Sequence, residues 1–388
     1  MSKIIELLRS LDKKLILILC MFCIISITAI YSSQQTGQYG STNFAFQQGR
    51  NYLIGFVLLI LVASIDWDQW QKLSCPMYII GFASIVILKI LPESTFTPVK
   101  LGAKRWFQFP VIGQIQPSEF FKIALIIFVA NLVVNHNAKY MIRTYKTDFL
   151  LVGKIMLVSI PPIALVYSQP DTGMVFLYAA SIVFILFISG IQKKLIAFCT
   201  FIPVTLLSTL IFTYVRYPDF FFKELVTRLK PHQQSRIIGW LNPAENADQG
   251  YQTQQSLLAV GSGELHGKGF GQGSVYIPEK HTDFIFATIA EEGGFIIAAL
   301  VVLVLLLLIY RVTIIAYSAE NLFGTLLCVG AISVLTLQIF QNIGIMPVKG
   351  IALPFLSYGG SSLFSNMIMI GLILSVHKNY KKYMFQVK

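Results

Sequence analysis

Charged residues are scarce in this 388-residue sequence, where Asp, Glu, Lys and Arg together make up 12%. A soluble domain carries roughly 25%. Hydrophobic residues reach 55%, and the mean hydropathy is +0.69. Soluble cores of this size could not bury so many apolar runs, whereas lipid accepts them directly. The composition therefore excludes a water-soluble protein and predicts a single polytopic membrane domain over residues 1–388.

Cysteine is also sparse, and its five positions follow no disulfide pattern. Cys20 and Cys23 form a CxxC, but all five cysteines lie in or beside apolar runs, which favours packing over redox or metal chemistry. The sequence has no Walker A loop, Rossmann fingerprint, HExxH motif or zinc spacing, and GKGFGQG at 267–273 has no preceding strand. We therefore expect neither a nucleotide nor an organic cofactor.

Long apolar stretches recur along the whole chain, and windows of about 19 residues mark ten candidate spans. They fall at 14–33, 51–66, 74–92, 118–135, 150–168, 173–190, 194–215, 284–310, 322–345 and 354–377. The second and sixth are close to the shortest length that crosses a bilayer, so nine and eleven spans are open alternatives. The sequence thus predicts an all-α integral membrane protein with about ten transmembrane helices.

The net charge of +12 could indicate a nucleic-acid partner, but Lys and Arg fall mainly at the termini and in short connections, where they orient a membrane protein. With the N-terminus inside, fifteen lie on the cytoplasmic side: Lys3, Arg9, Lys13, Lys14, Lys72, Lys139, Arg143, Lys146, Lys193, Lys194, Arg311, Lys378, Lys381, Lys382 and Lys388. Six lie in the opposite short connections: Arg50, Lys89, Lys100, Lys104, Arg105 and Lys349. This bias predicts that both termini are cytoplasmic, and we expect no nucleic-acid partner.

One connection, 216–283, is much longer than the others and lies outside the cytoplasm on this topology. Its apolar stretch at 256–260 predicts a short amphipathic element on the membrane face. Connections of this length in a compact protein are commonly lids or binding surfaces. We therefore expect the large extracellular loop to be functional.

Ionisable residues at membrane depth are costly and mark functional candidates. At the outer ends of the predicted helices they are Arg105, Glu119, Lys122, Asp171, Asp283, Glu291 and Glu292. Glu119 and Lys122 are three residues apart on one predicted helix, so they either form an ion pair or contact a substrate. Arg105 suits a phosphate because its guanidinium binds two oxygens at once, whereas Trp106 beside it is equally explained as an interfacial anchor.

Asp283 directly precedes a long apolar stretch. It could cap that helix, act as a general base or bind a metal ion. The segment 350–362 opens the last span with small polar residues and two adjacent glycines. Such a segment either lines a cavity or lets two helices pack closely.

Six motifs stand in one order along the chain: GAKRW (102–106), QPSEFFK (116–122), QPDTG (169–173), GYQTQQSLLAVGSG (250–263), PEKHTDFIFATIAEE (278–292) and LPFLSYGGSS (353–362). Through these motifs nearly the whole chain resembles the SEDS family of RodA, FtsW and SpoVE. GQYG at 37–40 and VYIPEKHTDF at 275–284 look most like RodA proteins of Gram-positive bacteria. The chain departs from the family pattern at Glu264, Gly293, Lys349 and Ala352, and Lys349 could alter pyrophosphate binding.

The resemblance implies a multi-pass protein of the bacterial plasma membrane, surrounded by membrane lipid. It implies a peptidoglycan glycosyltransferase that polymerises lipid II, the undecaprenyl-diphosphate-linked disaccharide pentapeptide, for cell-wall elongation and cell shape. A class B penicillin-binding protein is the implied partner. A lipid II flippase and a non-catalytic scaffold of the elongation or division complex are the alternatives.

The family's essential aspartate falls on Asp283. It is expected to activate the 4-hydroxyl of the acceptor sugar, either as a general base or as the ligand of a divalent cation, Mg²⁺ or Mn²⁺. The candidate substrate-binding residues are Arg105, Trp106, Gln116, Ser118, Glu119, Lys122, Asp171, Lys349 and Ser357.

Overall fold

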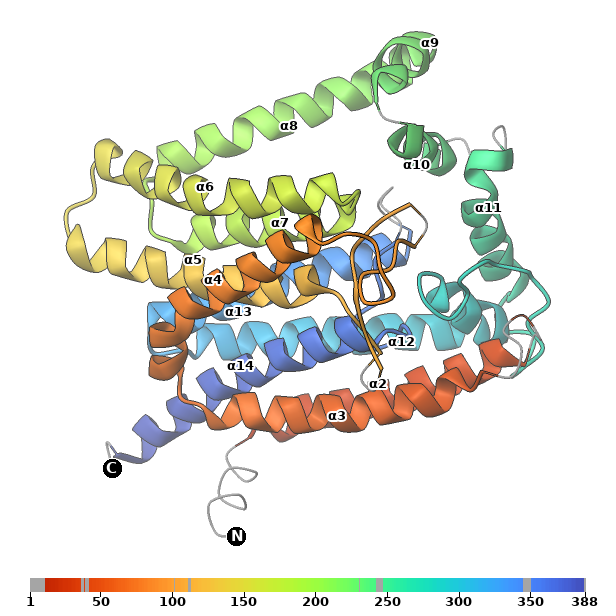
Figure 1. Cartoon of the computed structure of the whole chain (residues 1–388), viewed down its shortest axis with the longest axis horizontal. Coiled ribbons are helices and arrows are strands. Elements are labelled where there is room, and N and C mark those ends of the chain that lie inside the picture. Colours follow the sequence, from red (N-terminus) through yellow and green to blue (C-terminus); the bar gives the residue numbers. More distant parts are fainter. Residues whose placement is uncertain are drawn as a thin grey trace.

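The computed structural model describes residues 11–35, 38, 42–100, 102–110, 113–229, 231–241, 247–344 and 350–386. Within these ranges nine helices are long and apolar enough to cross a membrane, and α7 is a shorter apolar helix. The ten are α2 (Lys13–Gln34), α3 (Phe44–Ser64), α4 (Trp67–Ile90), α5 (Pro117–Lys139), α6 (Tyr145–Ser168), α7 (Thr172–Ile188), α8 (Lys193–Arg216), α12 (Ile285–Tyr317), α13 (Leu322–Asn342) and α14 (Gly360–Gln386). Each corresponds to one predicted span, and Figure 1 shows them gathered in one bundle.

Two helices begin about two turns earlier than the hydropathy windows predicted, at Phe44 instead of 51 and at Trp67 instead of 74. The first two turns of α3 contain Gln47, Gln48 and Arg50, and α4 begins with Asp68, Gln69 and Gln71. A hydropathy average reads such turns as loop. In α3, however, the side chain of Asn43 caps the helix and accepts the N–H of Phe46 at 2.9 Å. Gln48 is fully buried, but its Nε2 donates to Oγ of Ser26 and to the carbonyl of Ser357, so its polarity does not exclude it from a buried helix.

The last span was also predicted inaccurately, because α14 starts at Gly360 and not at 354. The residues before it form a compact turn, in which the N–H of Ser357 donates to the carbonyl of Leu353 at 3.1 Å. Phe355 in this turn has a positive φ of 65°, a conformation that a helix cannot accommodate. The helix therefore begins later than predicted because of local backbone geometry, which a hydropathy average does not report.

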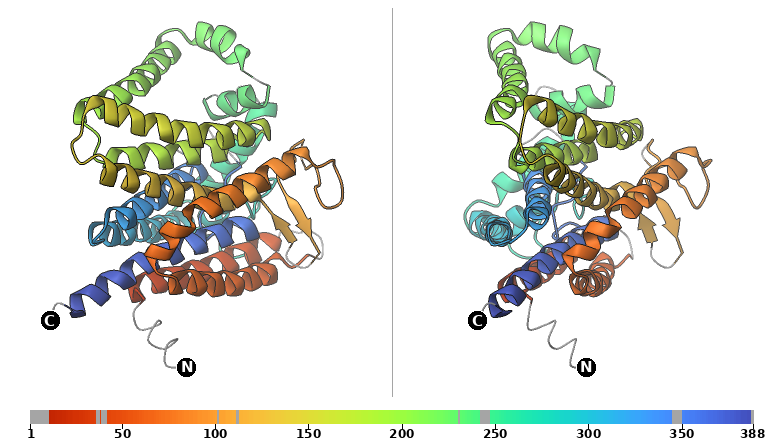
Figure 2. Two further views of the ribbon diagram at one scale, coloured as in Figure 1. Left: turned by 60° about the vertical axis from the view of Figure 1, so that its left-hand side comes forward. Right: turned by 90° about the vertical axis from the view of Figure 1, so that its left-hand side faces the viewer.

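The centre of the bundle is formed by α5, α13 and α14, whose apolar windows are 72%, 67% and 83% buried. α14 packs along α3, and α13 packs along α7. By contrast, α8 is only 6% buried and lies at the margin of the bundle in both views of Figure 2. The core therefore sits where the last helices pack against α3, α5 and α7.

The long connection between α8 and α12 contains several short helices at the end of the bundle opposite the chain termini (Figure 1). They are α9 (Pro218–Phe220), η1 (Phe221–Leu225), η2 (Val226–Arg228), α10 (Pro231–Leu241) and α11 (Ala247–Ser262). The predicted element at 256–260 is the second half of α11. There Leu257 and Leu258 are exposed while Ala259 is buried.

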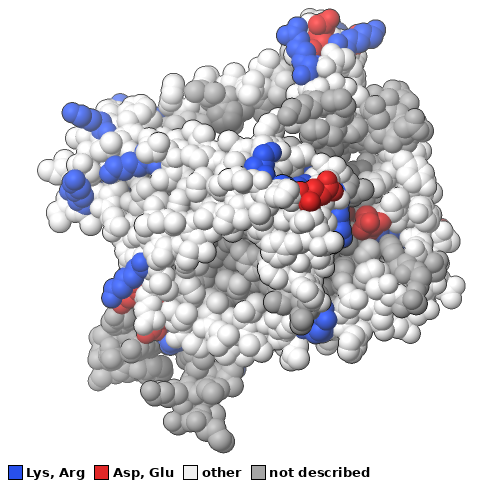
Figure 3. All heavy atoms as spheres, in the orientation of Figure 1, with Lys and Arg blue, Asp and Glu red and all other residues white. Residues whose placement is uncertain are grey.

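A two-stranded antiparallel hairpin, β1 (Phe107–Phe109) with β2 (Gly113–Ile115), leads into α5 and was not predicted from the sequence. It occupies the same end of the bundle as the loop helices. In Figure 3 the Lys, Arg, Asp and Glu side chains of the displayed face lie toward the two ends of the bundle and leave an uncharged belt between them. Such a belt is the surface expected of a protein that lipid surrounds.

Candidate functional site

Asp283 lies in the turn that joins the long connection to α12, and its side chain is half-buried. Its backbone carbonyl accepts a hydrogen bond from Nδ2 of Asn342, at the end of α13, over 2.8 Å. The same nitrogen donates to the carbonyl of Ile351 at 3.1 Å. The N-cap of α12 is Phe284, with no side-chain capping bond, so the capping position considered for Asp283 belongs to the next residue.

The residues just before Asp283 are held by the turn that precedes α14. Oγ of Ser357 donates to the carbonyl of Thr282 at 2.6 Å, and the N–H of Tyr358 donates to the carbonyl of His281 at 3.0 Å. The ring of His281 stacks on Phe44 with centroids 4.5 Å apart. Burial lowers the pKa of His281, which favours the neutral imidazole. Ser357, predicted as a substrate contact, therefore also positions the backbone next to Asp283.

A second group of charges, which we name the Glu291 cluster, comprises Lys268, Lys280 and Glu291. Nζ of Lys268 lies 2.8 Å and Nζ of Lys280 3.2 Å from the Glu291 carboxylate, and both Lys280 and Glu291 are completely buried. The carboxylate also accepts the N–H groups of Ser274 and Val275 at 2.8 and 3.0 Å. Sequence reasoning noted Glu291 only as an outer charge. The shared motif at 278–292 was a signal that Lys280 could be its partner.

The long connection reaches this cluster because α12 is interrupted at Gly294, whose φ is 68°. The interruption leaves the N–H of Phe295 available, and it donates to the carbonyl of Glu264 at 2.8 Å. Gly267 lies so close to α12 that a Cβ there would be 2.1 Å from the carbonyl oxygen of Glu292. Backbone hydrogen bonds at the interruption of α12 thus hold the long connection in place, including the part of it that leads to Asp283.

Arg105 forms the second polar feature at this end of the molecule, which we name the Arg105 turn: Arg105 together with Gln169 and Pro170. Nε of Arg105 donates to the carbonyl of Gln169 at 2.9 Å, and Nη2 donates to the carbonyl of Pro170. The guanidinium carbon lies 5.9 Å from the ring centre of Trp106. These carbonyls satisfy N–H groups but are neutral, so they do not cancel the positive charge of the half-buried side chain.

Three more predicted residues meet beside this turn. Nε2 of Gln116 donates to Oδ2 of Asp171 at 2.8 Å and to Oγ of Ser118 at 3.0 Å. Asp171 also caps α7 by accepting the N–H of Met174 at 3.3 Å. The N–H of Gln116 donates to Oγ of Ser361 in α14 at 3.0 Å. The fold therefore brings Gln116, Ser118 and Asp171 together, and each has a structural partner.

Glu119 and Lys122 form an ion pair of 2.5 Å inside the bundle, with side-chain exposures of 9% and 1%. Oγ of Ser365 donates to Glu119 at 3.0 Å, and Lys122 donates to Oδ1 of Asn366 at 3.3 Å. Of the two alternatives left open by the sequence, this geometry favours an ion pair that joins α5 to α14. Lys122 has almost no surface left with which to contact a substrate.

The segment 357–366 contacts three of these groups, through Ser357 near Asp283, Ser361 near Gln116, and Ser365 with Asn366 at the buried ion pair. Lys349 lies outside the described residues. Within the described ranges, no group of three or more His, Cys, Asp or Glu residues is arranged to hold a metal ion. A Mg²⁺ or Mn²⁺ ion at Asp283 stays a prediction.

Comparison with known families and proteins agrees with this architecture. The family model for FtsW, RodA and SpoVE, described as cell cycle protein, matches residues 9–382. "Stage V sporulation protein E" of Bacillus subtilis is 32% identical over 391 residues, covering 96% of this chain and 98% of that protein. "Peptidoglycan glycosyltransferase MrdB" of Escherichia coli K12 is 31% identical over 380 residues, covering 96% and 94%. "Probable peptidoglycan glycosyltransferase FtsW" of Geobacter sp. (strain M18) is 32% identical over 341 residues, covering 86% of each.

Two solved structures share the fold. A chain from "Structural coordination of polymerization and crosslinking by a peptidoglycan synthase complex" superposes with a TM-score of 0.73 at 23% identity, covering 95% of this chain and 98% of that one. The crystal structure of the rod shape determining protein RodA of Thermus thermophilus gives a TM-score of 0.66 at 22% identity, covering 95% and 97%. At these identities the match establishes the fold alone.

Proposed function

The chain belongs to the FtsW, RodA and SpoVE family of cell cycle proteins, and on this premise we propose that Asp283 is its catalytic residue and lipid II its substrate. The protein is a multi-pass membrane protein that acts as a peptidoglycan glycosyltransferase in cell-wall synthesis. The observation that carries the proposal is the placement of Asp283. Its backbone is fixed through Asn342 while its side chain is half-buried at the polar end of the bundle.

The proposed reaction is a single displacement in which Asp283 acts as the general base. It removes the proton from the 4-hydroxyl of the acceptor sugar as that oxygen bonds to the anomeric carbon of the donor. The bond from this carbon to undecaprenyl diphosphate breaks with its electron pair, and the configuration inverts. Arg105 is the proposed counter-charge for the departing diphosphate, because a guanidinium offers two parallel donors. Lys122 is left out of this role because it is buried against Glu119.

The decisive experiment incubates the purified full chain with fluorescent lipid II and separates the products on a gel. The wild type should make glycan ladders. Asp283→Asn should lose about 10²–10⁴-fold of the rate, the usual contribution of a general base. Glu279→Gln is the matched control, because Glu279 is an exposed carboxylate four residues away. A substantial ladder from Asp283→Asn at equal protein levels would remove Asp283 from the chemistry.

The same assay separates the alternative functions and the cation. A flippase or a scaffold predicts no ladder from the wild-type chain alone. A required Mg²⁺ or Mn²⁺, held jointly by Asp283 and the diphosphate, predicts that EDTA abolishes the ladder and that added Mg²⁺ or Mn²⁺ restores it. A base acting alone predicts no response to EDTA.

A class B penicillin-binding protein is the proposed partner, with a transpeptidase that crosslinks the new strands. The similar structure described as a synthase complex of polymerization and crosslinking supports this pairing. Copurification of this chain with its co-expressed penicillin-binding protein tests it, with an unrelated single-span protein as control. Recovery no greater than that of the control would count against the partner.

We further propose that both termini are cytoplasmic and that the long connection faces outward. The charge bias of the short connections supports this orientation. In a cysteine-free background, Gln272→Cys should react with a membrane-impermeant thiol reagent in intact wall-stripped cells, and Lys193→Cys should not. Both positions are exposed. Gln272 follows Gly271, whose N–H donates to Ser32 near the end of α2, whereas Lys193 is the first residue of α8. The reverse labelling pattern would invert the topology.

A further inference from the structure

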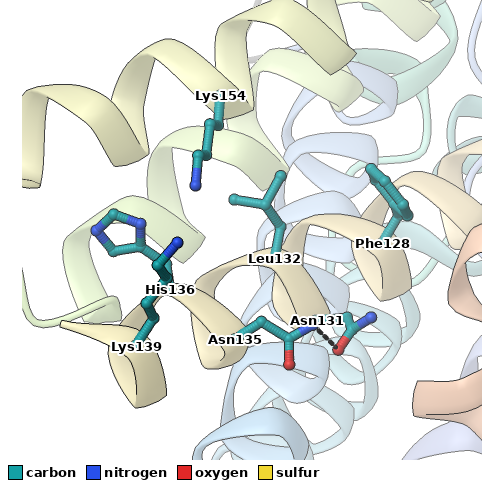
Figure 4. A pocket seen from close by; sticks show the side chains of 7 residues that line it. All are labelled: Phe128, Asn131, Leu132, Asn135, His136, Lys139 and Lys154. Atoms are coloured by element: carbon teal, nitrogen blue, oxygen red, sulfur yellow. Dashed lines mark hydrogen bonds between the residues drawn. The ribbon is translucent and has the colours of Figure 1, made fainter.

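A cavity of about 260 Å³ lies between α5 and α6, at the end of the bundle that carries both termini. It is distinct from the Asp283 end of the molecule. Its lining is Phe128, Asn131, Leu132, Asn135, His136, Lys139 and Lys154. In Figure 4, Lys154 extends from α6 toward α5, while His136, Lys139 and Leu132 extend from α5 toward α6. The cavity thus combines two ammonium groups and an imidazole with an apolar wall.

His136 is the buried polar group of this lining. It is only 3% exposed, and among the described residues neither ring nitrogen has a partner in hydrogen-bond geometry, although the backbone of Thr147 is nearby. A buried polar group without a well-placed partner is destabilising. A ligand that offers an oxygen to this ring would remove that cost.

The two lysines supply a net positive charge that the protein does not cancel. Neither Lys139 nor Lys154 takes part in an ion pair within the part of the chain that the structure describes. The nearest carboxylate acting on His136 belongs to Asp148, and it is already paired with Arg143 at 2.9 Å. The cavity therefore favours an anion.

The surroundings indicate that this anion is carried by a lipid. Lys154 shares a face of α6 with Leu150 and Leu157, which are 44% and 74% exposed, so the surface beside the cavity is one that acyl chains cover. Phe128 lies eleven residues from Lys139, about 16 Å along α5 at the usual helical rise. Apolar side chains deep in the cavity and lysines at its opening fit a lipid headgroup with its attached acyl chain.

We propose that this cavity binds the phosphate of an anionic phospholipid, with Lys139, Lys154 and His136 as its ligands. Basic pockets between membrane helices commonly recognise such headgroups. The phosphate accepts from both ammonium groups and from a ring N–H, and an acyl chain lies along Phe128 and Leu132. The bound lipid ties α5 to α6. The proposal is independent of the glycosyltransferase assignment, because it concerns lipid retention.

The test purifies the full chain in neutral detergent and measures its melting temperature with added phosphatidylglycerol, phosphatidylcholine or inorganic phosphate. Native mass spectrometry counts the retained lipids. Phosphatidylglycerol should be retained and should raise the melting temperature, whereas phosphatidylcholine should not. Lys139→Gln with Lys154→Gln should weaken phosphatidylglycerol binding by about 25-fold, or about five-fold for each lysine.

The matched control is Lys193→Gln with Lys194→Gln, which removes the same charge from exposed positions at the same end of the bundle. It should bind phosphatidylglycerol as the wild type does. If the first double variant does not fold, Lys139→Gln alone carries the test, because that side chain is exposed. Equal stabilisation by phosphatidylcholine, full stabilisation by phosphate alone, or an equal loss in the control would overturn the proposal.

Discussion

The Glu291 cluster and the Arg105 turn hold charged side chains at the same end of the bundle in different ways. Lys280 and Glu291 are completely buried and neutralise each other. Arg105 is half-buried, and its hydrogen bonds recorded in the structure go to two neutral carbonyls. Removing one partner of a buried pair of opposite charges is strongly destabilising, because the other charge is left buried and uncompensated. A cation bonded to neutral carbonyls keeps its charge and can still attract an anion.

This difference assigns separate tasks to the two regions. The Glu291 cluster fixes the loop that leads to Asp283, and its loss should appear first in stability. The Arg105 turn offers positive charge to a diphosphate, so substitution of Arg105 should lower the affinity for substrate before it lowers stability. Substitutions in each region separate the two tasks.

Glu291→Gln should be the most damaging of these substitutions. It leaves the ammonium groups of Lys268 and Lys280 without their counter-charge, and removing one partner of a buried pair costs about 3–5 kcal/mol. We expect a marked fall in melting temperature in detergent and poor accumulation in the membrane. Glu279→Gln, at an exposed position of the same connection, should melt as the wild type does. Equal melting of Glu291→Gln and the wild type would refute the structural role.

Lys122→Met should come next, with a loss of about 3 kcal/mol, because it leaves Glu119 charged and buried. Adding Glu119→Gln should recover most of that loss. If the pair only ties α5 to α14, the double variant should also polymerise lipid II. A double variant that folds normally but makes no glycan would show instead that the pair contacts the substrate.

Arg105→Lys should leave stability nearly unchanged and weaken lipid II binding. Lysine keeps the charge but loses the planar pair of donors, and a hydrogen bond to a charged group contributes about 1.5–3 kcal/mol. Affinity, measured by fluorescent lipid II titration, should therefore fall by roughly ten-fold or more. Trp106→Phe is the control and should have a mild effect. Unchanged affinity in Arg105→Lys would end the diphosphate assignment.

The smallest expected effect is a pH dependence at His281. Because burial lowers its folded-state pKa below the ordinary 6.5, the unfolded chain binds more protons between those two values. Stability should therefore fall as the pH drops through about 6.5 toward the folded-state pKa. His281→Phe, which retains a ring against Phe44, should reduce the difference in melting temperature between pH 7.5 and 5.5. An unchanged difference would place the titrating group elsewhere.

Much of the fold could be predicted from the sequence, because the length and the apolar content of a membrane-crossing helix are local properties of the chain. The ten spans and the spacing of Glu119 and Lys122 are read within single segments. The early start of α3 was missed because Gln48 looks like a loop residue until its buried partners are known. The tie between Lys268 and Glu291 was missed because 23 residues separate them. Lys154 was overlooked because it lies inside an apolar span.

The sequence alone indicates that lipid is the solvent of this protein, that it forms about ten apolar helices, and which motifs contain the candidate chemistry. Only the fold shows which charged side chains are buried in ion pairs and which are partly exposed. Burial and counter-charge come from distant residues: Lys122 is enclosed by α14, and Asp283 is held by Asn342 of α13. Periodicity and spacing describe neighbours along the chain, whereas the electrostatic state of a side chain depends on neighbours in space.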